Sequence, residues 1–186
     1  MTAMAERHTA RTTAPAVTYE STETTAQKAA RYMWAGVRLA LAFTFLWAFL
    51  DKVFGFGFAT PSERSWVNGG SPTKGFLSGS EGPFADFYHN LAGTGFANWA
   101  FMLGLLGIGL ALTFGIGMRI AAASGALLYV MMWSVALPPE TNPFMDEHLI
   151  FAAVLVGLAL VGAGRTLGFG GYWEKLPIVK RLPWLK

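Results

Sequence analysis

Four apolar stretches, each long enough to cross a bilayer, constrain the fold of this chain more than any other feature of its sequence. They cover about residues 30–50, 98–115, 120–137 and 143–162. A helix rises 1.5 Å per residue, so about 20 residues cross the hydrocarbon layer of ~30 Å. Charged residues make up 13% of the chain, which is about half their share in soluble domains. We therefore predict an all-α membrane protein whose residues 30–165 form a bundle of four transmembrane helices.

The segments outside the predicted spans have a different composition. Residues 1–29 are rich in Thr, Ala and charge and have no apolar period, which predicts a disordered tail. Residues 52–97 form a long loop that we expect to be partly helical, because Thr60-Pro-Ser-Glu63 matches a capping box. The same loop holds an amphipathic pattern typical of a short surface helix: Phe84, Phe87, Tyr88 and Leu91. Residues 166–186 are predicted to form a basic tail at the membrane interface.

The fourth span carries its own start signal. Asn142 precedes Pro143, and these residue types are favoured at the N-cap and at the first helical position. We therefore expect this helix to begin at Pro143 and to continue to about Gly162.

The basic residues predict the orientation of the bundle. With the N-terminus in the cytoplasm, only Lys52, Arg64 and Lys74 of the 14 Lys and Arg residues fall outside. Most acidic residues fall on that outer side. Because Lys and Arg concentrate in cytoplasmic loops, we predict that both termini, including the tail of residues 1–29, are cytoplasmic.

Arg38 lies inside the first span, about 12 Å from its start. An ionisable group inside a span is costly, so it is a functional-site hypothesis by default. The alternative is that the long side chain reaches the headgroups or pairs with a lipid phosphate. Arg119 and Arg165 are predicted at the same face, where three guanidinium groups could bind an anionic lipid, a phosphate or a partner's carboxylates.

Other ionisable residues gather at the predicted outer ends of the spans. Asp51 closes the first span, and His148 follows Asp146-Glu147 at the start of the fourth. Antiparallel topology brings these ends to the same depth, so we predict Asp51 and His148 as the catalytic pair. Quinone chemistry needs donors for each carbonyl and a route for protons, and an imidazole exchanges protons near neutral pH. The predicted quinone-binding residues are Arg38, Trp47, Asp51, Trp133 and His148.

The alternative interpretation of the residues at the start of the fourth span is purely structural. Acidic residues are expected in the first turn of a helix, where they interact favourably with the helix dipole.

The shortage of soft ligands limits the cofactors. The chain has no cysteine and three histidines. This excludes thiol catalysis, Fe–S clusters and thiolate zinc sites, and it leaves too few histidines for a di-heme bundle. We expect no heme, Fe–S cluster or zinc, so redox activity would need a bound quinone or a partner's cofactor.

Short motifs in a fixed order resemble the DoxX/DoxD family of small four-helix membrane proteins. They are Gly36-Val-Arg38-Leu, Leu50-Asp-Lys52-Val-Phe-Gly55, Gly115-Ile-Gly-Met-Arg119-Ile-Ala-Ala, His148, and Gly162-Ala-Gly-Arg165. The resemblance covers about residues 30–170, and the outer loop is longer than in the shortest members. It implies a multi-pass protein of the bacterial cytoplasmic membrane. It further implies a subunit of a thiosulfate:quinone oxidoreductase or of an oxidative-stress or thiol redox system, with Arg38, Asp51 and His148 matching the quinone role.

Three functions are compatible with the sequence. The first is a quinone-linked oxidoreductase subunit, and the second is a non-catalytic anchor or assembly subunit of a redox or respiratory complex. The third is a small-solute carrier, although no pair of interrupted helices marks a midplane site. All three place the chain in the lipid bilayer with a protein partner or a second copy of itself, and none involves nucleic acid.

Overall fold

The computed structural model describes residues 23–140 and 142–186, and over these residues the protein is all-helical. Three helices are long and apolar enough to cross a membrane: α1 (Thr25–Phe54), α4 (Gly95–Phe114) and α5 (Met118–Val135). Their exposed surfaces carry large apolar side chains such as Phe43 and Leu103, which suit contact with lipid. The chain is therefore a membrane protein with three candidate membrane-spanning helices.

The first helix begins earlier than the sequence indicated. Thr24 and Gln27 form a capping box, in which the Gln27 amide donates to Thr24 Oγ1 (3.2 Å) and the Thr24 amide donates to Gln27 Oε1 (2.8 Å). Residues 25–29 are therefore helical, whereas residues 1–22 of the predicted disordered tail lie outside the described residues. At the other end, Gly55 stops the helix with a left-handed φ of 70°.

The fourth apolar helix, α6 (Glu147–Leu160), is shorter than the predicted span of 143–162. Its N-cap is Asp146 instead of Asn142, because the Asp146 carboxylate accepts the amides of His148 and Leu149. The Asn142 side chain instead accepts the amides of residues 144 and 145 and holds a turn ahead of the helix. Fourteen residues rise about 21 Å, which is less than the thickness of the hydrocarbon layer.

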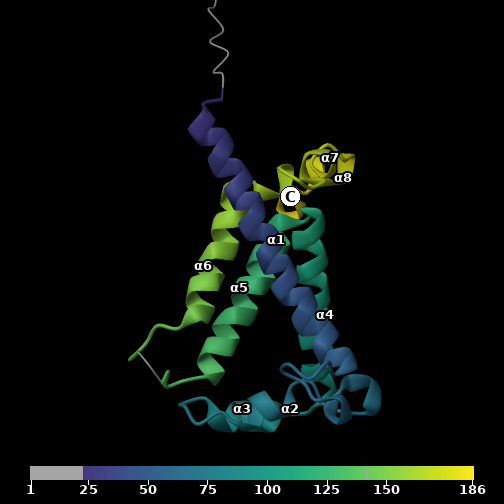
Figure 1. The fold of residues 1–186 in the computed structure, drawn as a ribbon, viewed down its shortest axis with the longest axis vertical. Helices are drawn as coiled ribbons and strands as arrows, with labels where there is room; N and C mark the ends of the chain where they lie inside the picture. Colours follow the sequence, from purple (N-terminus) through teal and green to yellow (C-terminus); the bar gives the residue numbers. More distant parts are fainter. Residues whose placement is uncertain (1–22, 141) are drawn as a thin grey trace, which may run out of the picture.

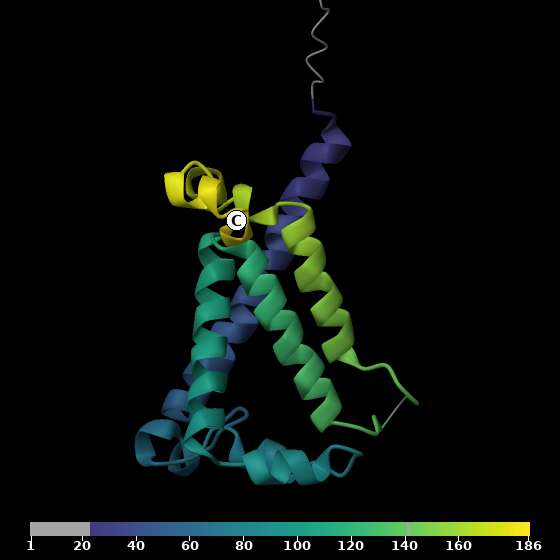
Figure 2. The ribbon, with the colours of Figure 1, turned by 180° about the vertical axis from the view of Figure 1, so that it is seen from behind.

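The four apolar helices pack in two pairs. α1 packs mainly against α4, and α5 packs mainly against α6. Each pair contains a glycine that allows close approach: a Cβ on Gly109 would lie 2.7 Å from the Leu46 side chain, and one on Gly125 would lie 2.6 Å from Leu155. α4 and α5 meet at the turn Gly115–Gly117 and diverge toward their other ends, as Figures 1 and 2 show.

The long loop folds into short helices across the end where α4 and α5 have diverged (Figure 1). In order along the chain they are η1 (Ser62–Arg64), η2 (Trp66–Asn68), α2 (Lys74–Ser78) and α3 (Ala85–Leu91). Asn98 of α4 holds this loop, because its Oδ1 accepts the amide and hydroxyl of Thr73 and the hydroxyl of Ser71. We call this end of the molecule the outer end.

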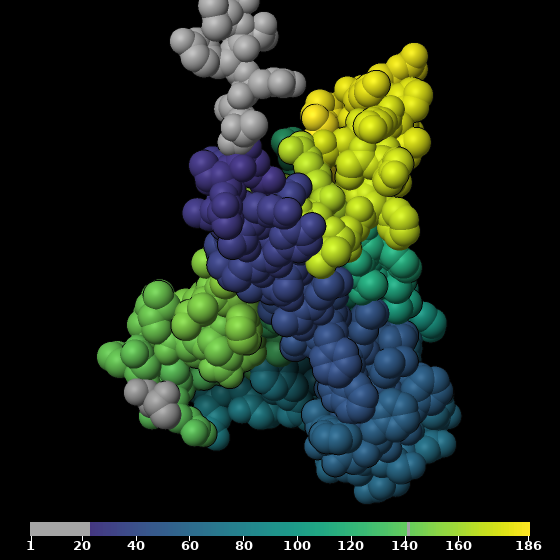
Figure 3. All heavy atoms as spheres, turned by 45° about the horizontal axis from the view of Figure 1, so that its top comes forward, coloured from purple at the N-terminus to yellow at the C-terminus, as the bar shows by residue number. Residues whose placement is uncertain are grey.

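The C-terminal segment folds back over the opposite end, which we call the inner end and which also holds the start of α1 (Figure 1). Its elements are η3 (Ala163–Arg165), α7 (Gly170–Trp173), α8 (Pro177–Arg181) and η4 (Pro183–Leu185). The Phe169 amide donates to Phe114 O (2.7 Å), and the Arg119 amide donates to Lys186 O (2.7 Å). Figure 3 shows the segment as a compact block beside α1.

Candidate functional site

Arg38 is fully buried near the inner end. Its guanidinium group donates to four backbone carbonyls, those of Leu112 and Thr113 at the end of α4 and those of Thr166 and Leu167 after η3. The last carbonyls of a helix lack partners within it and carry partial negative charge. Arg38 therefore joins α1, α4 and the C-terminal segment. The alternative interpretation expected the Arg38 side chain to reach the headgroups. In the structure the side chain is buried inside the fold instead.

Asp51 is also buried, at the outer end of α1. Its carboxylate accepts the amides of Phe58 (3.4 Å) and Ala59 (3.0 Å). These bonds hold the chain where it turns back after Gly55. The carboxylate is thus engaged with the start of the outer loop.

His148 forms a pair with Asp146 at the start of α6. The distance from His148 Nδ1 to Asp146 Oδ2 is 2.7 Å, and both side chains are largely buried. The imidazole also packs against the ring of Tyr129, with 6.0 Å between centroids.

The structure does not bring Asp51 and His148 together as a site. Among the described residues, no hydrogen bond or ion pair joins them, and each has its own partners. Their helices lie at similar depth but separate laterally toward the outer end, where α1 stays beside α4 and α6 stays beside α5 (Figures 1 and 2). The antiparallel topology matches the depths, but the splay between the two helix pairs keeps the side chains apart.

The two tryptophans of the predicted set also lie in separate places. Trp47 stacks with Phe43 and Phe56 on the surface of α1. Trp133 donates from Nε1 to Phe144 O (2.8 Å) and fixes the segment that leads into α6. Both positions suit an interface belt, where an aromatic ring has one apolar side and one polar end.

A cavity of about 370 Å³ lies between α4 and α5 in the outer half of the molecule. The two helices diverge there, and the loop helices α2 and α3 close the outer end of the space (Figure 2). Its wall is almost entirely apolar and includes Phe96, Ala100, Phe101, Gly104, Ile108, Leu127, Leu128, Met131, Met132 and Val135. Phe96 and Leu127 are both strongly exposed, so the cavity reaches the lipid-facing surface.

Few polar groups line this cavity. Lys52 is half-buried, and its Nζ lies 5.8 Å from the centre of the Phe101 ring. Tyr88, from α3, contributes its ring, while its hydroxyl is hydrogen-bonded to Ser134 Oγ. Ser124 donates its hydroxyl to Ile120 O (2.8 Å). Lys52 therefore supplies the charged hydrogen-bond donor in the wall of an otherwise apolar cavity.

Lys52 and Tyr88 are residues that the predicted site did not include. Lys52 is adjacent in sequence to Asp51, and Tyr88 belongs to the amphipathic pattern of the loop. The sequence signals available for these two residues were a charge in the last turn of an apolar helix and an aromatic residue in a surface helix. Nothing in those signals indicated that α4 and α5 diverge and leave a space between them.

The family models, the curated proteins and the solved structures contain no match to this chain.

Proposed function

We propose that this chain is a DoxX-like, four-helix membrane subunit of a quinone-linked redox system and that it holds a quinone ring between α4 and α5. One observation carries the proposal: an apolar cavity of about 370 Å³ with a lysine ammonium in its wall. Small-molecule sites are mostly apolar, contain a few well-placed polar groups, and have volumes of roughly 300–1,000 Å³. A quinone has the matching chemistry, because it combines an apolar ring and tail with two carbonyl acceptors.

The residues of the cavity fit this ligand. Lys52 would donate a charge-assisted hydrogen bond to one carbonyl, and Phe101 and Ala100 would contact the ring. The exposed Phe96 and Leu127 border the side that opens toward lipid, which is where an isoprenoid tail would leave. When bound, the quinone would supply two-electron, two-proton redox chemistry that the side chains of this protein lack.

The residues predicted as catalytic take supporting roles in this proposal. Asp51 holds the turn after α1 and thereby positions the adjacent Lys52. The Asp146–His148 pair does not line the cavity, and proton exchange by His148 stays a prediction. Arg38 joins the helices at the inner end and stabilises the fold that contains the cavity.

Membrane topology is part of the same proposal. α6 would serve as the fourth helix of the bundle because it packs along α5, with the membrane thinned or its flanking residues immersed to offset its short length. The inner end carries Arg119, Arg165, Lys180 and Arg181. This basic end favours a cytoplasmic location for both termini in a bacterial inner membrane.

The test is quinone binding to the purified protein in nanodiscs, measured by quenching of tryptophan fluorescence with short-chain benzoquinone and naphthoquinone analogues. Lys52→Met should weaken binding roughly 10- to 100-fold, because a hydrogen bond from a charged donor contributes about 1.5–3 kcal/mol. Gly104→Leu should abolish binding, since its new side chain enters the cavity. Gly107→Leu is the matched control, because Gly107 lies on the same helix, does not line the cavity, and has open space around it.

A wild-type protein that binds neither analogue would refute the proposal. So would equal affinity in the Gly104→Leu and Gly107→Leu variants. Either result would favour the non-catalytic anchor as the function.

A further inference from the structure

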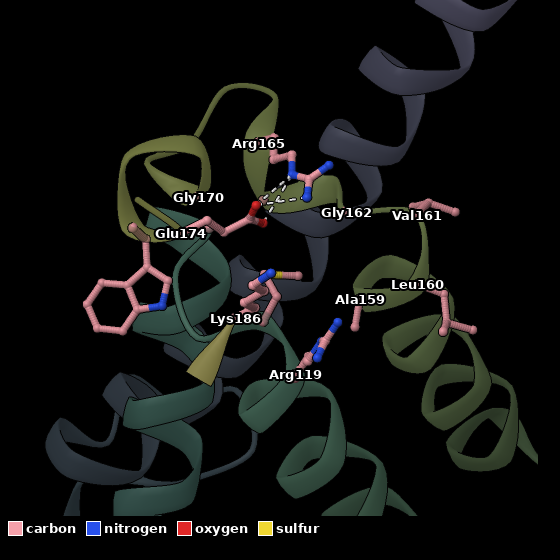
Figure 4. A pocket seen from close by; sticks show the side chains of 13 residues that line it. Arg119, Ala159, Leu160, Val161, Gly162, Arg165, Gly170, Glu174 and Lys186 are labelled. Atoms are coloured by element: carbon pink, nitrogen blue, oxygen red, sulfur yellow. Dashed lines mark hydrogen bonds and ion pairs between the residues drawn. The ribbon is translucent and has the colours of Figure 1, made fainter. Parts of the chain in front are cut away.

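A second pocket lies at the inner end, away from the α4–α5 cavity. It has a volume of about 170 Å³ and forms where the α4–α5 turn, the end of α6 and the C-terminal segment meet (Figure 4). Three cationic residues line it, Arg119, Arg165 and Lys186, together with one carboxylate, Glu174. The balance of these side chains is therefore two positive charges.

The Glu174 carboxylate is already engaged by one of the cations. Arg165 donates to Glu174 from Nε (3.0 Å) and from Nη2 (2.8 Å), as the dashed lines in Figure 4 show. This hydrogen bonding and the negative charge raise the pKa of Arg165, so the guanidinium stays charged. Arg119 donates one hydrogen bond from Nη1 to Pro183 O (2.9 Å). The ammonium of Lys186 makes no hydrogen bond within the described residues. Free donors of Arg119 and Lys186 thus remain.

The buried guanidinium of Arg38 lies close to the floor of the pocket. The floor consists of closely packed backbone at Gly115, Gly164 and Gly170, where a Cβ on Gly164 would lie within 2.3 Å of Gly115 O. Directly behind Gly115 lies the Arg38 guanidinium, whose Nη1 is 2.9 Å from where a Cβ of that glycine would be. In the described part of the chain, Arg38 has carbonyl partners but no carboxylate partner. An anion in the pocket would therefore interact with this charge as well.

Exposed apolar residues adjoin the cations on one side. Leu160 is 81% exposed and Val161 is 53% exposed, and both line the pocket at the end of α6. Exposed apolar side chains do not contribute to the binding of a free inorganic anion. A phospholipid, in contrast, places acyl chains beside its phosphate. The volume equals that of about five or six water molecules at ~30 Å³ each, enough for a phosphate and part of its glycerol.

We propose that this pocket binds the phosphate of an anionic phospholipid from the leaflet at the inner end of the protein. Arg119 and Lys186 contact the phosphate, Arg165 closes the rim through its bond to Glu174, and Leu160 and Val161 contact the acyl chains. Basic pockets between helices at the cytoplasmic side suit this kind of ligand. The inference does not depend on quinone binding.

The experiment is native mass spectrometry of the full chain in detergent, with added phosphatidylglycerol, phosphatidylcholine or inorganic phosphate. The wild-type protein should retain phosphatidylglycerol in preference to phosphatidylcholine. The double variant Arg119→Gln/Lys186→Gln should bind phosphatidylglycerol at least tenfold more weakly. Ala159→Phe should have a similar effect while leaving every charge in place, because Ala159 lines the pocket.

Matched controls separate this site from general surface charge and from loss of fold. Arg181→Gln removes an exposed cation of the same segment, and Ala153→Phe adds the same ring to an exposed position of α6; neither residue lines the pocket. Both should bind phosphatidylglycerol like the wild type. If the double variant unfolds, Lys186→Gln alone should still weaken binding, because its ammonium supports no hydrogen bond in the described chain.

Three results would overturn the proposal. Equal retention of the two lipids removes the anion preference. Displacement of phosphatidylglycerol by inorganic phosphate at the same phosphate concentration identifies a free-phosphate site. Wild-type affinity in the Lys186→Gln and Ala159→Phe variants places the lipid elsewhere.

Discussion

Arg38 is the residue on which the inner end of the fold depends most. A buried guanidinium is costly to desolvate, and here four carbonyls from two distant segments offset that cost. Arg38→Met should lower the free energy of unfolding by about 3 kcal/mol or more, since each buried carbonyl left without a donor costs about 1–3 kcal/mol. Unfolding in mixed micelles with increasing SDS, followed by circular dichroism, measures this loss.

Arg31 provides the control for that substitution. It lies on the same helix, and its side chain is 48% exposed in an ion pair with Glu23. Arg31→Met should cost less than about 1 kcal/mol, as is usual for exposed ion pairs. Equal losses in the two variants would contradict the structural role of Arg38.

The pairing of the helices depends on glycines at the contacts between elements. Gly109 of α4 faces Leu46 of α1, with no room for a side chain, whereas a Cβ on Gly107 would meet nothing within 4 Å. Gly109→Leu should therefore force α1 and α4 apart and destabilise the protein by about 1–3 kcal/mol. Gly107→Leu should be neutral or slightly stabilising, because leucine favours the helix more than glycine does.

Thermal unfolding of both variants in the same detergent tests this difference. A Gly109→Leu protein as stable as Gly107→Leu would show that α1 and α4 do not pack through this face.

At the scale of the whole molecule, the separation of basic and acidic residues predicts the topology. Because the chain has no cysteine, single cysteines can be introduced without a background. Ser78→Cys, in the exposed outer loop, should react with a membrane-impermeant maleimide added to intact cells. Lys180→Cys, in the exposed C-terminal segment, should react only after the cells are permeabilised. The opposite pattern would reverse the proposed orientation, and labelling of both sites in intact cells would exclude it.

Much of the helical pattern could be read from the sequence, and its failures have local physical causes. The apolar runs at residues 98–115 and 120–137 located α4 and α5. The start of α6 was misplaced because Asn142 and Asp146 are both good N-caps. Only the structure shows that the Asn142 side chain accepts hydrogen bonds within the turn before the helix. Asp146 is therefore the N-cap of α6.

The candidate site was less predictable than the helices. The ends of the predicted spans and their antiparallel order place Asp51 and His148 at the same depth, but they contain no information on lateral distance. The place of Arg38 in an apolar run left two outcomes open, burial inside the fold or extension to the headgroups, and the structure shows burial. The identity of its partners could not be predicted, because the carbonyls of residues 112, 113, 166 and 167 come from segments far away in the chain.

By itself, the sequence determined that this protein is helical and belongs in a membrane, because long apolar runs can satisfy their backbone groups in lipid only by forming helices or closed barrels. It also determined which residues are available for chemistry, since cysteine is absent and most ionisable groups apart from Arg38 lie at or beyond the ends of the spans. Tertiary structure decided where the cavity and the inner-end pocket lie. The divergence of α4 from α5 and the return of the C-terminal segment over the inner end depend on contacts between distant residues. Those contacts place Lys52 beside an apolar cavity, and they gather Arg119, Arg165 and Lys186 around a pocket at the opposite end.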